Sequence, residues 1–394
     1  MPIKRKSVVK KDFIVIGAGI IGLTMTVRLL EAGASVTLLE RNIVGNEASW
    51  AGGGILSTLF PWDYPESVNQ LAMYSTSLYP HWTAALKVQT GIDPEYQVCG
   101  LHILHSDESD QARARNWCAA HAATIKPHSL FLGADELVNI NESRSDQSTH
   151  ATLFMPGVAQ VRNPRLLRAL KIRIEQLRGD IVEHCEVSRL NSRDLKVTGL
   201  QTSHRQITGD QYIVAAGAWS SQLLGEHALN LDIRPIRGQM LLYKLPQSPI
   251  QSVIAERTHY LIPRQDGHIL VGSTTEDTGF NKSTTIEARI QLSDWAGNLL
   301  PTLRNTPPLQ HWSGLRPASY RDLPTIGRHP ILKNLYINSG HFRYGVTMAP
   351  GSAEILLNEI IERAQPFSIS PYQQGWQSVV HSSVIKGASK NSEF

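Results

Sequence analysis

The chain has 394 residues, of which 41% are hydrophobic and 18% charged, and its formal net charge is +4. This composition excludes a disordered chain, and the length predicts two or three domains at about 150 residues each. The small net charge indicates no nucleic-acid partner. The basic cluster Lys4, Arg5, Lys6, Lys10 and Lys11 is interpreted as a solvated tail, with a membrane or partner contact as the alternative.

The cysteines and histidines indicate neither a disulfide framework nor a metal site. Cys99, Cys118 and Cys185 are odd in number and lack CxxC spacing, which fits a reducing cytoplasm. His102 and His105 lie in a stretch that alternates like a strand, so they are expected on opposite faces. We therefore predict no bound metal and a cytoplasmic location.

An uncharged run from Phe13 to Val27 follows the basic start and imitates a signal peptide. It is shorter than the roughly 20 residues of a transmembrane helix, and no clear cleavage site follows it. Three regularly spaced glycines inside it are better explained by a nucleotide-binding turn. We expect no stable membrane insertion.

The first elements in chain order form a βαβ unit. Residues 12–16 read as a buried parallel strand, and a glycine turn leads into a helix that ends at Gly33. Residues 35–39 form the next strand, which ends at Glu40. From Pro61 to about residue 150 we expect helical stretches and short strands.

The middle of the chain continues with elements of the opening type. Asn163 is predicted to cap a helix that has Pro164 at its first position and ends at Gly179. Strands are expected at 181–187 and 211–215.

From about residue 231 the pattern predicts antiparallel strands. Residues 260–263 and 269–272 flank an Asp266-Gly267 hairpin turn. Near Pro324 the chain is expected to return to the first domain, with a strand at 335–338, a glycine-rich turn and a last helix.

This order predicts one discontinuous domain with a second domain inserted into it. The first comprises residues 1–60, 151–230 and 317–370, and the second comprises 61–150 and 231–316; residues 371–394 form a tail. Sites commonly lie where two such domains meet.

A dinucleotide fingerprint stands in the first unit. Gly17-x-Gly19-x-x-Gly22 follows a strand and opens a helix, and Glu40 comes 18 residues after the third glycine. The glycines allow a tight turn, approach to a pyrophosphate and close helix–strand packing, while the acid accepts the ribose hydroxyls. The N–H groups of residues 20–21 would meet phosphate at the helix N-terminus.

Two later segments favour FAD over NAD. Small residues fill Ala48–Ile55, where the backbone can lie against a flat ring or a second phosphate, and a strand at 213–216 runs into Gly217-Ala218-Trp219. For each segment alone, ordinary close packing remains the alternative.

Five further segments carry a resemblance to a known family, namely Arg237–Met240, Tyr260–Arg264, Val271–Thr274, Trp312–Pro317 and Gly340–Gly345. With the fingerprint they make residues 12–364 resemble the D-amino-acid oxidase family of FAD enzymes, and within it the glycine oxidases of bacterial thiamine biosynthesis. The resemblance implies an α/β fold, in which a Rossmann-type FAD-binding domain holds an inserted α+β substrate domain built on an antiparallel sheet.

The resemblance also implies roles for individual residues. Arg316 would pair with the substrate carboxylate, Arg343 would lie near both flavin and substrate, and Tyr260 would line the pocket. Non-covalent FAD would be bound by Gly17, Gly19, Ile20, Ile21, Gly22, Glu40, Arg41, Ala48, Ser49, Gly53, Gly54, Ile55, Val187, Gly217, His341, Phe342, Arg343, Tyr344, Gly345, Val346 and Thr347. The family pattern is broken at Thr275, where some members carry methionine, and at Tyr344, where others carry a smaller polar residue.

The implied reaction is oxidation of glycine, another small amine or a D-amino acid by hydride transfer from Cα to flavin N5. Dioxygen would reoxidise the flavin and yield hydrogen peroxide, and the imine would hydrolyse or enter thiazole formation. We expect no catalytic His–Asp pair, with His259 and His311 in packing or hydrogen-bonding roles. Residues 345–350 are expected to precede a helix whose N-terminus stabilises negative charge on the flavin. Similar enzymes form homotetramers, so a homo-oligomer is implied.

Three alternatives stay open. A monomeric sarcosine oxidase would need a flavin-linking cysteine in the C-terminal half, and the last cysteine here is Cys185. A D-amino-acid dehydrogenase would pass its electrons to a membrane quinone. A non-catalytic flavin-binding module is disfavoured because Arg316, Tyr260 and Arg343 are all present.

Overall fold

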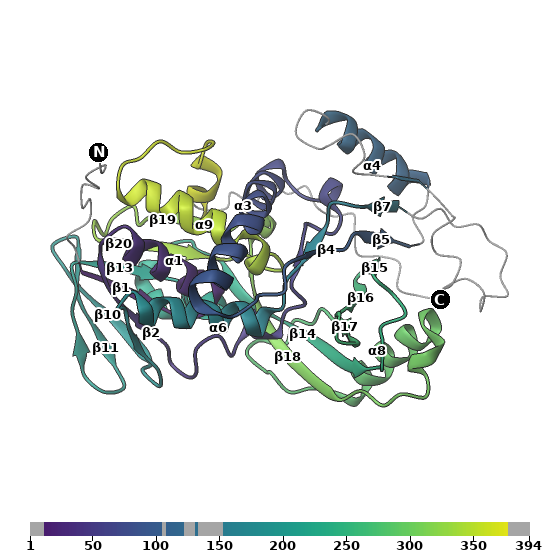
Figure 1. The fold of residues 1–394 in the computed structure, drawn as a ribbon. Coiled ribbons are helices and arrows are strands. Elements are labelled where there is room, and N and C mark those ends of the chain that lie inside the picture. The colour runs from purple at the N-terminus through teal and green to yellow at the C-terminus, as the bar shows by residue number, and fades with distance from the viewer. Residues whose placement is uncertain (1–11, 105–107, 122–130, 133–152, 377–394) are drawn as a thin grey trace.

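The computed structural model describes residues 12–104, 108–121, 131–132 and 153–376. The basic cluster of residues 4–11, His105 and the part of the predicted tail from residue 377 lie outside this range. The described chain forms two large sheets, which lie side by side with helices packed around them (Figure 1).

The first sheet has six strands in the order β19-β20-β13-β1-β2-β9, and all neighbours are parallel except the β19–β20 pair. The central strand β1 therefore lies between β2 and β13, as a nucleotide-binding fold requires. The six strands are β1 (Asp12–Ile16), β2 (Ser35–Leu39), β9 (Asp180–Val182), β13 (Gln211–Val214), β19 (Thr325–Arg328) and β20 (Leu335–Ser339).

Both faces of this sheet are covered, which explains why its strands are apolar throughout. Phe13 and Val15 belong to the core beneath the helices, whereas Ile14 and Ile16 pack toward a small three-stranded sheet. The helices are α1 (Ile20–Glu31), α3 (Glu66–Thr90), α6 (Asn163–Gln176) and α9 (Gly345–Ile360), and the small sheet is β10 (Val187–Arg193), β11 (Lys196–Thr202) and β12 (Gln206–Ile207).

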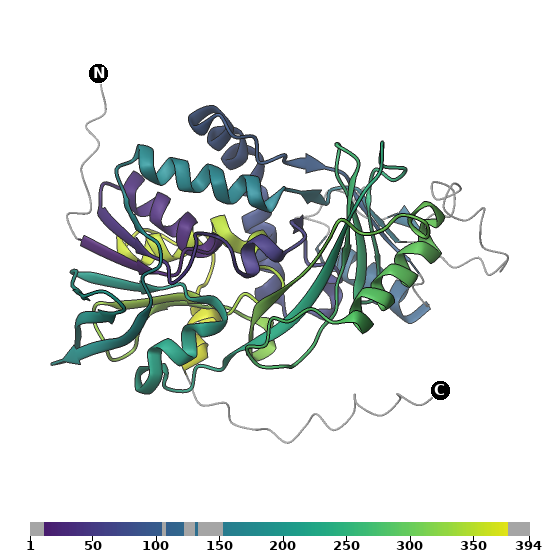
Figure 2. The same cartoon turned by 90° about the horizontal axis from the view of Figure 1, so that it is seen from below.

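The second sheet has eight strands in the order β18-β14-β17-β16-β15-β5-β7-β6, and only β15–β5 is a parallel pair. Helix α8 (Ile286–Leu299) packs on one face (Figure 2). Met240 and Tyr260 belong to the core on the other face. The strands are β5 (Leu101–Ile103), β6 (Phe131–Leu132), β7 (Leu153–Met155), β14 (Ile233–Lys244), β15 (Val253–Glu256), β16 (His259–Pro263), β17 (His268–Gly272) and β18 (Gln310–Ser319).

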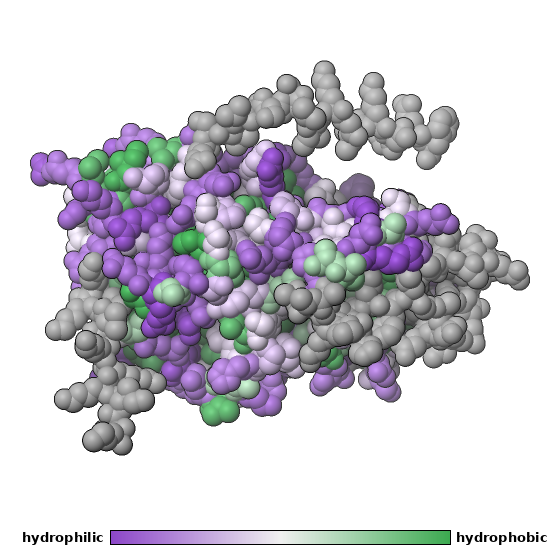
Figure 3. Space-filling model, turned by 90° about the horizontal axis from the view of Figure 1, so that it is seen from above, coloured by the Kyte–Doolittle hydropathy of each residue, from purple (hydrophilic) through white to green (hydrophobic). Residues whose placement is uncertain are grey.

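The remaining described elements are short or peripheral. Besides several 3₁₀ helices, they are α2 (Ala48–Ala51), α4 (Glu108–Ala120), α7 (Ser220–Leu224) and a small sheet of β3 (Ile55–Leu56), β4 (Gln97–Val98) and β8 (Ala159–Gln160). Hydrophilic residues predominate on the face seen in Figure 3, with apolar residues scattered between them. Among the helices described, none combines the length and the apolar character needed to cross a bilayer.

Three local predictions are corrected by the structure. The strand expected at 181–187 divides into β9 and β10, because the chain turns at His184, which has φ +56°. Asn163 does not cap α6: its side-chain amide donates to the carbonyls of Ser49 (2.8 Å) and Gly52 (2.9 Å) instead. Residues 345–350 do not precede the last helix but form the first turns of α9 itself.

The predicted division into two domains stays a prediction, but several contacts cross its boundaries. Helix α3 packs against α6 and α9 beside the first sheet, and β7 pairs with β5 in the second. Tyr372, at the start of the predicted tail, is fully buried and donates to the carbonyl of Ser67 at 2.6 Å.

Candidate active site

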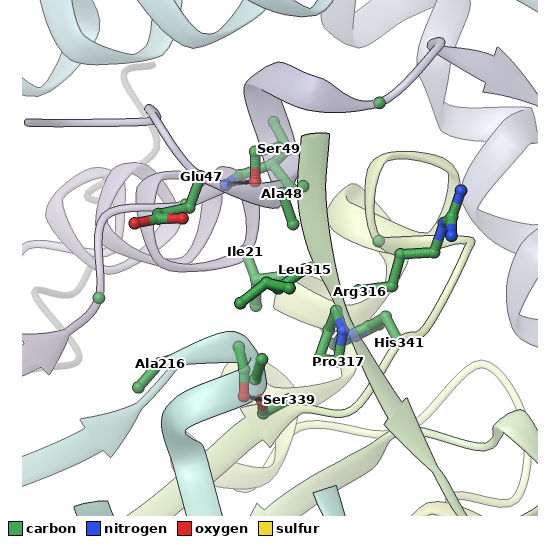
Figure 4. Close-up of a pocket in the computed structure, with 18 of the residues that line it drawn as sticks. Ile21, Glu47, Ala48, Ser49, Ala216, Leu315, Arg316, Pro317, Ser339 and His341 are labelled. Carbon is green, nitrogen blue, oxygen red and sulfur yellow. Dashed lines mark hydrogen bonds between the residues drawn. The ribbon is translucent and has the colours of Figure 1, made fainter. Parts of the chain in front are cut away.

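The predicted site residues converge on one cavity of about 450 Å³ between the two sheets (Figure 4). Its walls come from the carboxyl ends of β1, β2 and β13, from β16 and β18, and from the turn after β20. The lining includes Gly17, Gly19, Ile20, Ile21, Glu40, Arg41, Ala48, Ser49, Gly53, Gly54, Ile55, Val187, Gly217, Tyr260, Arg316, His341, Phe342, Arg343, Tyr344, Gly345 and Val346.

Gly22 and Thr347, two predicted cofactor residues, do not line the cavity but contact residues that do. A β-carbon at Gly22 would lie 1.9 Å from the carbonyl oxygen of Gly17, so only glycine lets α1 approach the turn this closely. Gly17 itself has φ +102°, which favours glycine. Thr347 donates from its hydroxyl to the carbonyl of Ile55 at 3.0 Å and so ties α9 to the cavity wall.

The N-terminus of α1 opens onto the cavity beside Ser49. The Ile20 N–H donates to the Ser49 hydroxyl oxygen at 2.8 Å, so that amide is already used by the protein. The Ser49 hydroxyl hydrogen is therefore left to donate elsewhere, and Ile21 lies in the first turn, whose N–H groups have no acceptor within the helix. This donor set suits an anionic group such as a phosphate.

Glu40 stands at the end of β2 and is only 7% exposed. Its two carboxylate oxygens accept from the backbone N–H groups of Ala18 (2.9 Å) and Asn42 (3.0 Å). These bonds fix the carboxylate against the cavity, while each oxygen keeps a further lone pair for a ligand hydroxyl. The geometry fits the ribose role that the sequence predicts.

Asn338 was not among the predicted site residues, yet it lines the cavity and is fully buried. Both its amide nitrogen and its amide oxygen lack a hydrogen-bond partner among the described residues. Buried amides are normally satisfied, so this orphaned group indicates a polar ligand in the cavity. Together with Glu40 and the α1 N-terminus, it makes the donor and acceptor set that a dinucleotide such as FAD requires.

Arg316 projects from β18 on the side opposite to Leu315, which points toward Ile21 (Figure 4). Its guanidinium donates to the Ser273 hydroxyl (2.7 Å) and to the carbonyls of Thr274 (3.1 Å) and Arg237 (3.4 Å). Burial lowers the pKa of this guanidinium, but an arginine remains charged at neutral pH. The side chain is a fixed cation at the cavity wall.

Gly238 makes the room for that cation. A β-carbon at residue 238 would lie 2.1 to 2.3 Å from the three terminal atoms of Arg316. Neither Gly238 nor its neighbour Met240 was predicted as a site residue, although both belong to a segment that carries the family resemblance. In the sequence, the only indication of a role for these two residues was their place in the segment Arg237–Met240.

Tyr260 and Arg343 complete the end of the cavity that holds Arg316. The Tyr260 ring lies between Gly53 and Gly272, within about 3 Å of where a β-carbon at residue 272 would be. The Arg343 guanidinium donates to the Thr275 hydroxyl at 2.9 Å. The sequence differs from the family pattern at Thr275 and Tyr344, and these two residues have different contacts. Thr275 contacts a site arginine directly, whereas the Tyr344 ring packs edge-on against Tyr64.

His341 is buried at the cavity, and its Nε2 lies 2.9 Å from the Ser352 hydroxyl on α9. Burial lowers the pKa of His341 to about 3, so its imidazole is neutral at physiological pH. His259 and His311 are not among the residues that line the cavity, and the His259 ring lies against that of Trp295 with 5.2 Å between the centroids. Their expected roles stay predictions. Burial lowers the pKa of both.

A buried arginine, Arg264, braces the wall that carries Gly53. It donates to the Gly53 carbonyl (2.8 Å), to the Val161 carbonyl (2.9 Å) and to the Gln160 side chain (2.8 Å). Burial and, to a smaller extent, the neighbouring Arg162 lower the pKa of Arg264 to about 10. Sequence reasoning assigned it no role, because its partners lie more than 100 residues away in the chain.

Comparisons with known proteins show the family of the chain. A family model described as "FAD dependent oxidoreductase" (DAO) matches residues 12–358. The chain is 40% identical to the glycine oxidase of Pseudomonas aeruginosa, with 91% of this chain and 97% of that protein covered. It is 31% identical to the bifunctional protein ThiO/ThiG of Trichormus variabilis, which covers 90% of this chain and 53% of that protein. The crystal structure of a glycine oxidase from Bacillus cereus matches with a TM-score of 0.80 and 27% identity, over 90% of this chain and 95% of that one.

Proposed function

The chain belongs to the DAO family of FAD-dependent oxidoreductases, and on that premise we propose that it oxidises glycine or another small amino acid. The oxidation would remove two electrons and convert the amino acid to an imine, and hydrolysis of the imine would complete the deamination. The glycine oxidase names of its relatives support this substrate class.

The proposal rests chiefly on the hydrogen-bond partners of the Arg316 guanidinium. In the described part of the chain, this guanidinium donates only to neutral oxygens and pairs with no carboxylate. A buried cation is stabilised best by a carboxylate held at two points, which is what an amino-acid substrate offers. Tyr260, across the same end of the cavity, can donate a second hydrogen bond to that carboxylate.

FAD, when bound, supplies the acceptor for the hydride that leaves the substrate Cα. The chain's own residues hold the substrate in place, and this orientation contributes much of the rate. No side chain is required as a strong base, because the substrate ammonium can lose its proton to water on binding. His341 does not serve as a proton-carrying acid, since burial keeps its pKa at about 3. The first turn of α9 lines the cavity and directs partial positive charge into it.

The electron acceptor, location and assembly belong to the same proposal. Dioxygen is the acceptor we propose, with hydrogen peroxide as the product, and the imine would supply thiazole formation in thiamine biosynthesis. Cys99, Cys118 and Cys185 are all free thiols, which supports a reducing cytoplasm. A homo-oligomer remains the expected assembly.

An oxygen-electrode assay tests the proposal. Purified protein is given glycine, sarcosine, D-alanine or D-proline, and oxygen uptake and peroxide are recorded. Uptake with at least one of them is expected. A flavoprotein that reduces an artificial quinone but consumes no oxygen would instead be a dehydrogenase.

The mode of flavin attachment is tested by acid precipitation. Cys185 is the last cysteine of the chain. It lines the cavity beside Val187, and its N–H donates to the Glu40 carbonyl at 2.8 Å, so it lies at the end where Glu40 stands and not at the end that holds Arg316. We expect the yellow chromophore to pass into the acid supernatant. Flavin that stays with the precipitated protein would contradict non-covalent binding.

A further inference from the structure

An exposed segment of the second half of the chain reaches the rim of the cofactor cavity. Residues 277–284, here called the strap, connect β17 to α8 without forming a helix or strand, and all are exposed. Two of its side chains, Phe280 and Lys282, contact residues that line the cavity. None of the roles assigned above involves them.

The first contact is electrostatic. Glu47 lines the cavity, and its side chain is 19% exposed. Its carboxylate accepts from the Lys282 ammonium at 3.0 and 3.1 Å and from the Arg41 guanidinium at 2.8 Å. Glu47 projects toward the side of the pocket opposite to Arg316 (Figure 4). The strap therefore acts at the end of the cavity that is remote from the substrate.

The second contact is aromatic. The Phe280 ring stacks on that of Trp219, with 5.5 Å between the ring centroids and 29° between the ring planes. The guanidinium of Arg41 lies 3.6 Å from the centroid of the same Trp219 ring. Arg41 and Trp219 both line the cavity, so the two strap contacts meet in one cluster.

The strap is anchored at its base in the second sheet. Arg237 on β14 donates to the carbonyl of Ser283 at 2.8 Å, and Gln239 accepts from the N–H of Thr285 at 2.8 Å. Ser313 on β18 donates from its hydroxyl to the carbonyl of Lys282. The strap is thus fixed to the sheet that carries Arg316, and its Lys282 binds Glu47 in the loop after β2.

We infer that Phe280 and Lys282 retain the cofactor, by holding the strap across the rim formed by Arg41, Glu47 and Trp219. This inference rests on FAD being the ligand of the cavity. Release of FAD requires the rim to open, and opening separates the ion pair and the aromatic stack together. The dissociation rate of FAD is therefore set partly by residues that line no part of the cavity.

The test measures FAD release from the holoenzyme, followed by the rise of flavin fluorescence after a large dilution into buffer, where rebinding is negligible. Lys282→Met and Phe280→Ala should each release FAD about three- to tenfold faster, as expected for one partly exposed ion pair or one aromatic pair. Lys282→Arg should restore slow release. Added salt should accelerate release from the wild type and have less effect on Lys282→Met.

Arg234→Met provides the matched control. Arg234 forms an exposed ion pair with Asp277 of the same strap at 3.3 Å, but neither residue lines the cavity. The rate of FAD release from Arg234→Met should equal that from the wild type. Equal acceleration in this variant, or wild-type release from both Lys282→Met and Phe280→Ala, would overturn the inference while leaving the FAD assignment intact. A wild-type protein that binds no FAD would overturn the proposed function as well.

Discussion

The guanidinium of Arg316 lies directly over the α-carbon of Gly238, so closely that a β-carbon there would come within 2.3 Å of it. The two residues sit on paired strands, β18 and β14, in which Gly238 faces Gly314 and Ile236 faces Arg316. The absence of a side chain at Gly238 thus allows the Arg316 guanidinium to take its position in the cavity. Removing the charge of Arg316 and adding a methyl group at Gly238 should therefore have separable effects.

Arg316→Leu should nearly abolish amino-acid oxidation while the flavin spectrum of the folded protein is kept. Loss of one partner from a desolvated charge pair costs about 2–5 kcal/mol, or roughly 30- to 5,000-fold in kcat/KM. Arg316→Lys should recover only part of this, because an ammonium cannot make a planar two-point contact. Steady-state kinetics with glycine measure the change.

A ligand titration provides the control for Arg316. Benzoate or glycolate should perturb the flavin spectrum of the wild type and leave that of Arg316→Leu unchanged. If the leucine variant oxidises glycine within threefold of the wild type, the carboxylate site lies elsewhere.

Gly238→Ala should move Arg316 without removing its charge. Relief of the overlap requires a displacement of about 1 Å, which typically costs about 100-fold in rate when a positioning group is misplaced. The loss should exceed that of Gly157→Ala, where a β-carbon would meet no atom within 4 Å. Comparable kcat/KM values for the two alanine variants would show that the cavity absorbs the extra atom.

Glu40→Ala should weaken FAD binding while the fold survives. A hydrogen bond to a charged group contributes roughly 1.5–3 kcal/mol, which corresponds to about 10- to 150-fold in the FAD dissociation constant. Titration of the apoprotein by flavin fluorescence gives the value. Glu31→Ala, which removes an acid that pairs with Arg173 on the surface, should leave the constant unchanged.

His341 makes the fold sensitive to acid. Its folded pKa of about 3 lies below its ordinary value of 6.5, so between these values the unfolded chain binds a proton that the folded chain does not. Stability therefore falls as the pH falls through this window, by about 2 kcal/mol between pH 7 and pH 5 for this group. Urea unfolding at the two pH values should show a smaller difference in His341→Gln than in the wild type.

The exposed His204→Gln serves as the comparison for that measurement. Its pH dependence should follow the wild type. An unchanged difference in His341→Gln would show that other groups carry the acid sensitivity of the fold.

Local signals predicted the first βαβ unit well, because the turn chemistry of Gly17 and Gly22 and the apolar strands lie within 30 residues of one another. The antiparallel hairpin was equally accessible through Asp266-Gly267, and β16 and β17 confirm it. Where a long-range contact competes with local preference, the prediction was wrong. Asn163 has the right residue type for a cap, but its amide is engaged by the backbone of Ser49 and Gly52.

The supporting residues of the site were beyond sequence reasoning for the same reason. Arg264 reaches Gly53, 211 positions earlier, and no periodicity or turn signal records such a contact. Asn338 reads in the sequence as one more residue of a buried strand. Its unsatisfied amide becomes visible only when the neighbouring strands and the turn at Gly17 are in place.

The order of the first sheet has a consequence for how the protein is made. Strand β1 leaves the ribosome before β20 and the turn after it, which complete the cavity beside Gly17 and lie more than 300 residues later in the sequence. The βαβ unit at residues 12–39 must therefore wait for the synthesis of these later residues with its nucleotide face incomplete. A ligand that contacts both the Gly17 turn and residues 341–346 would bind only after both segments are made, and it would join parts of the chain that are far apart in the sequence.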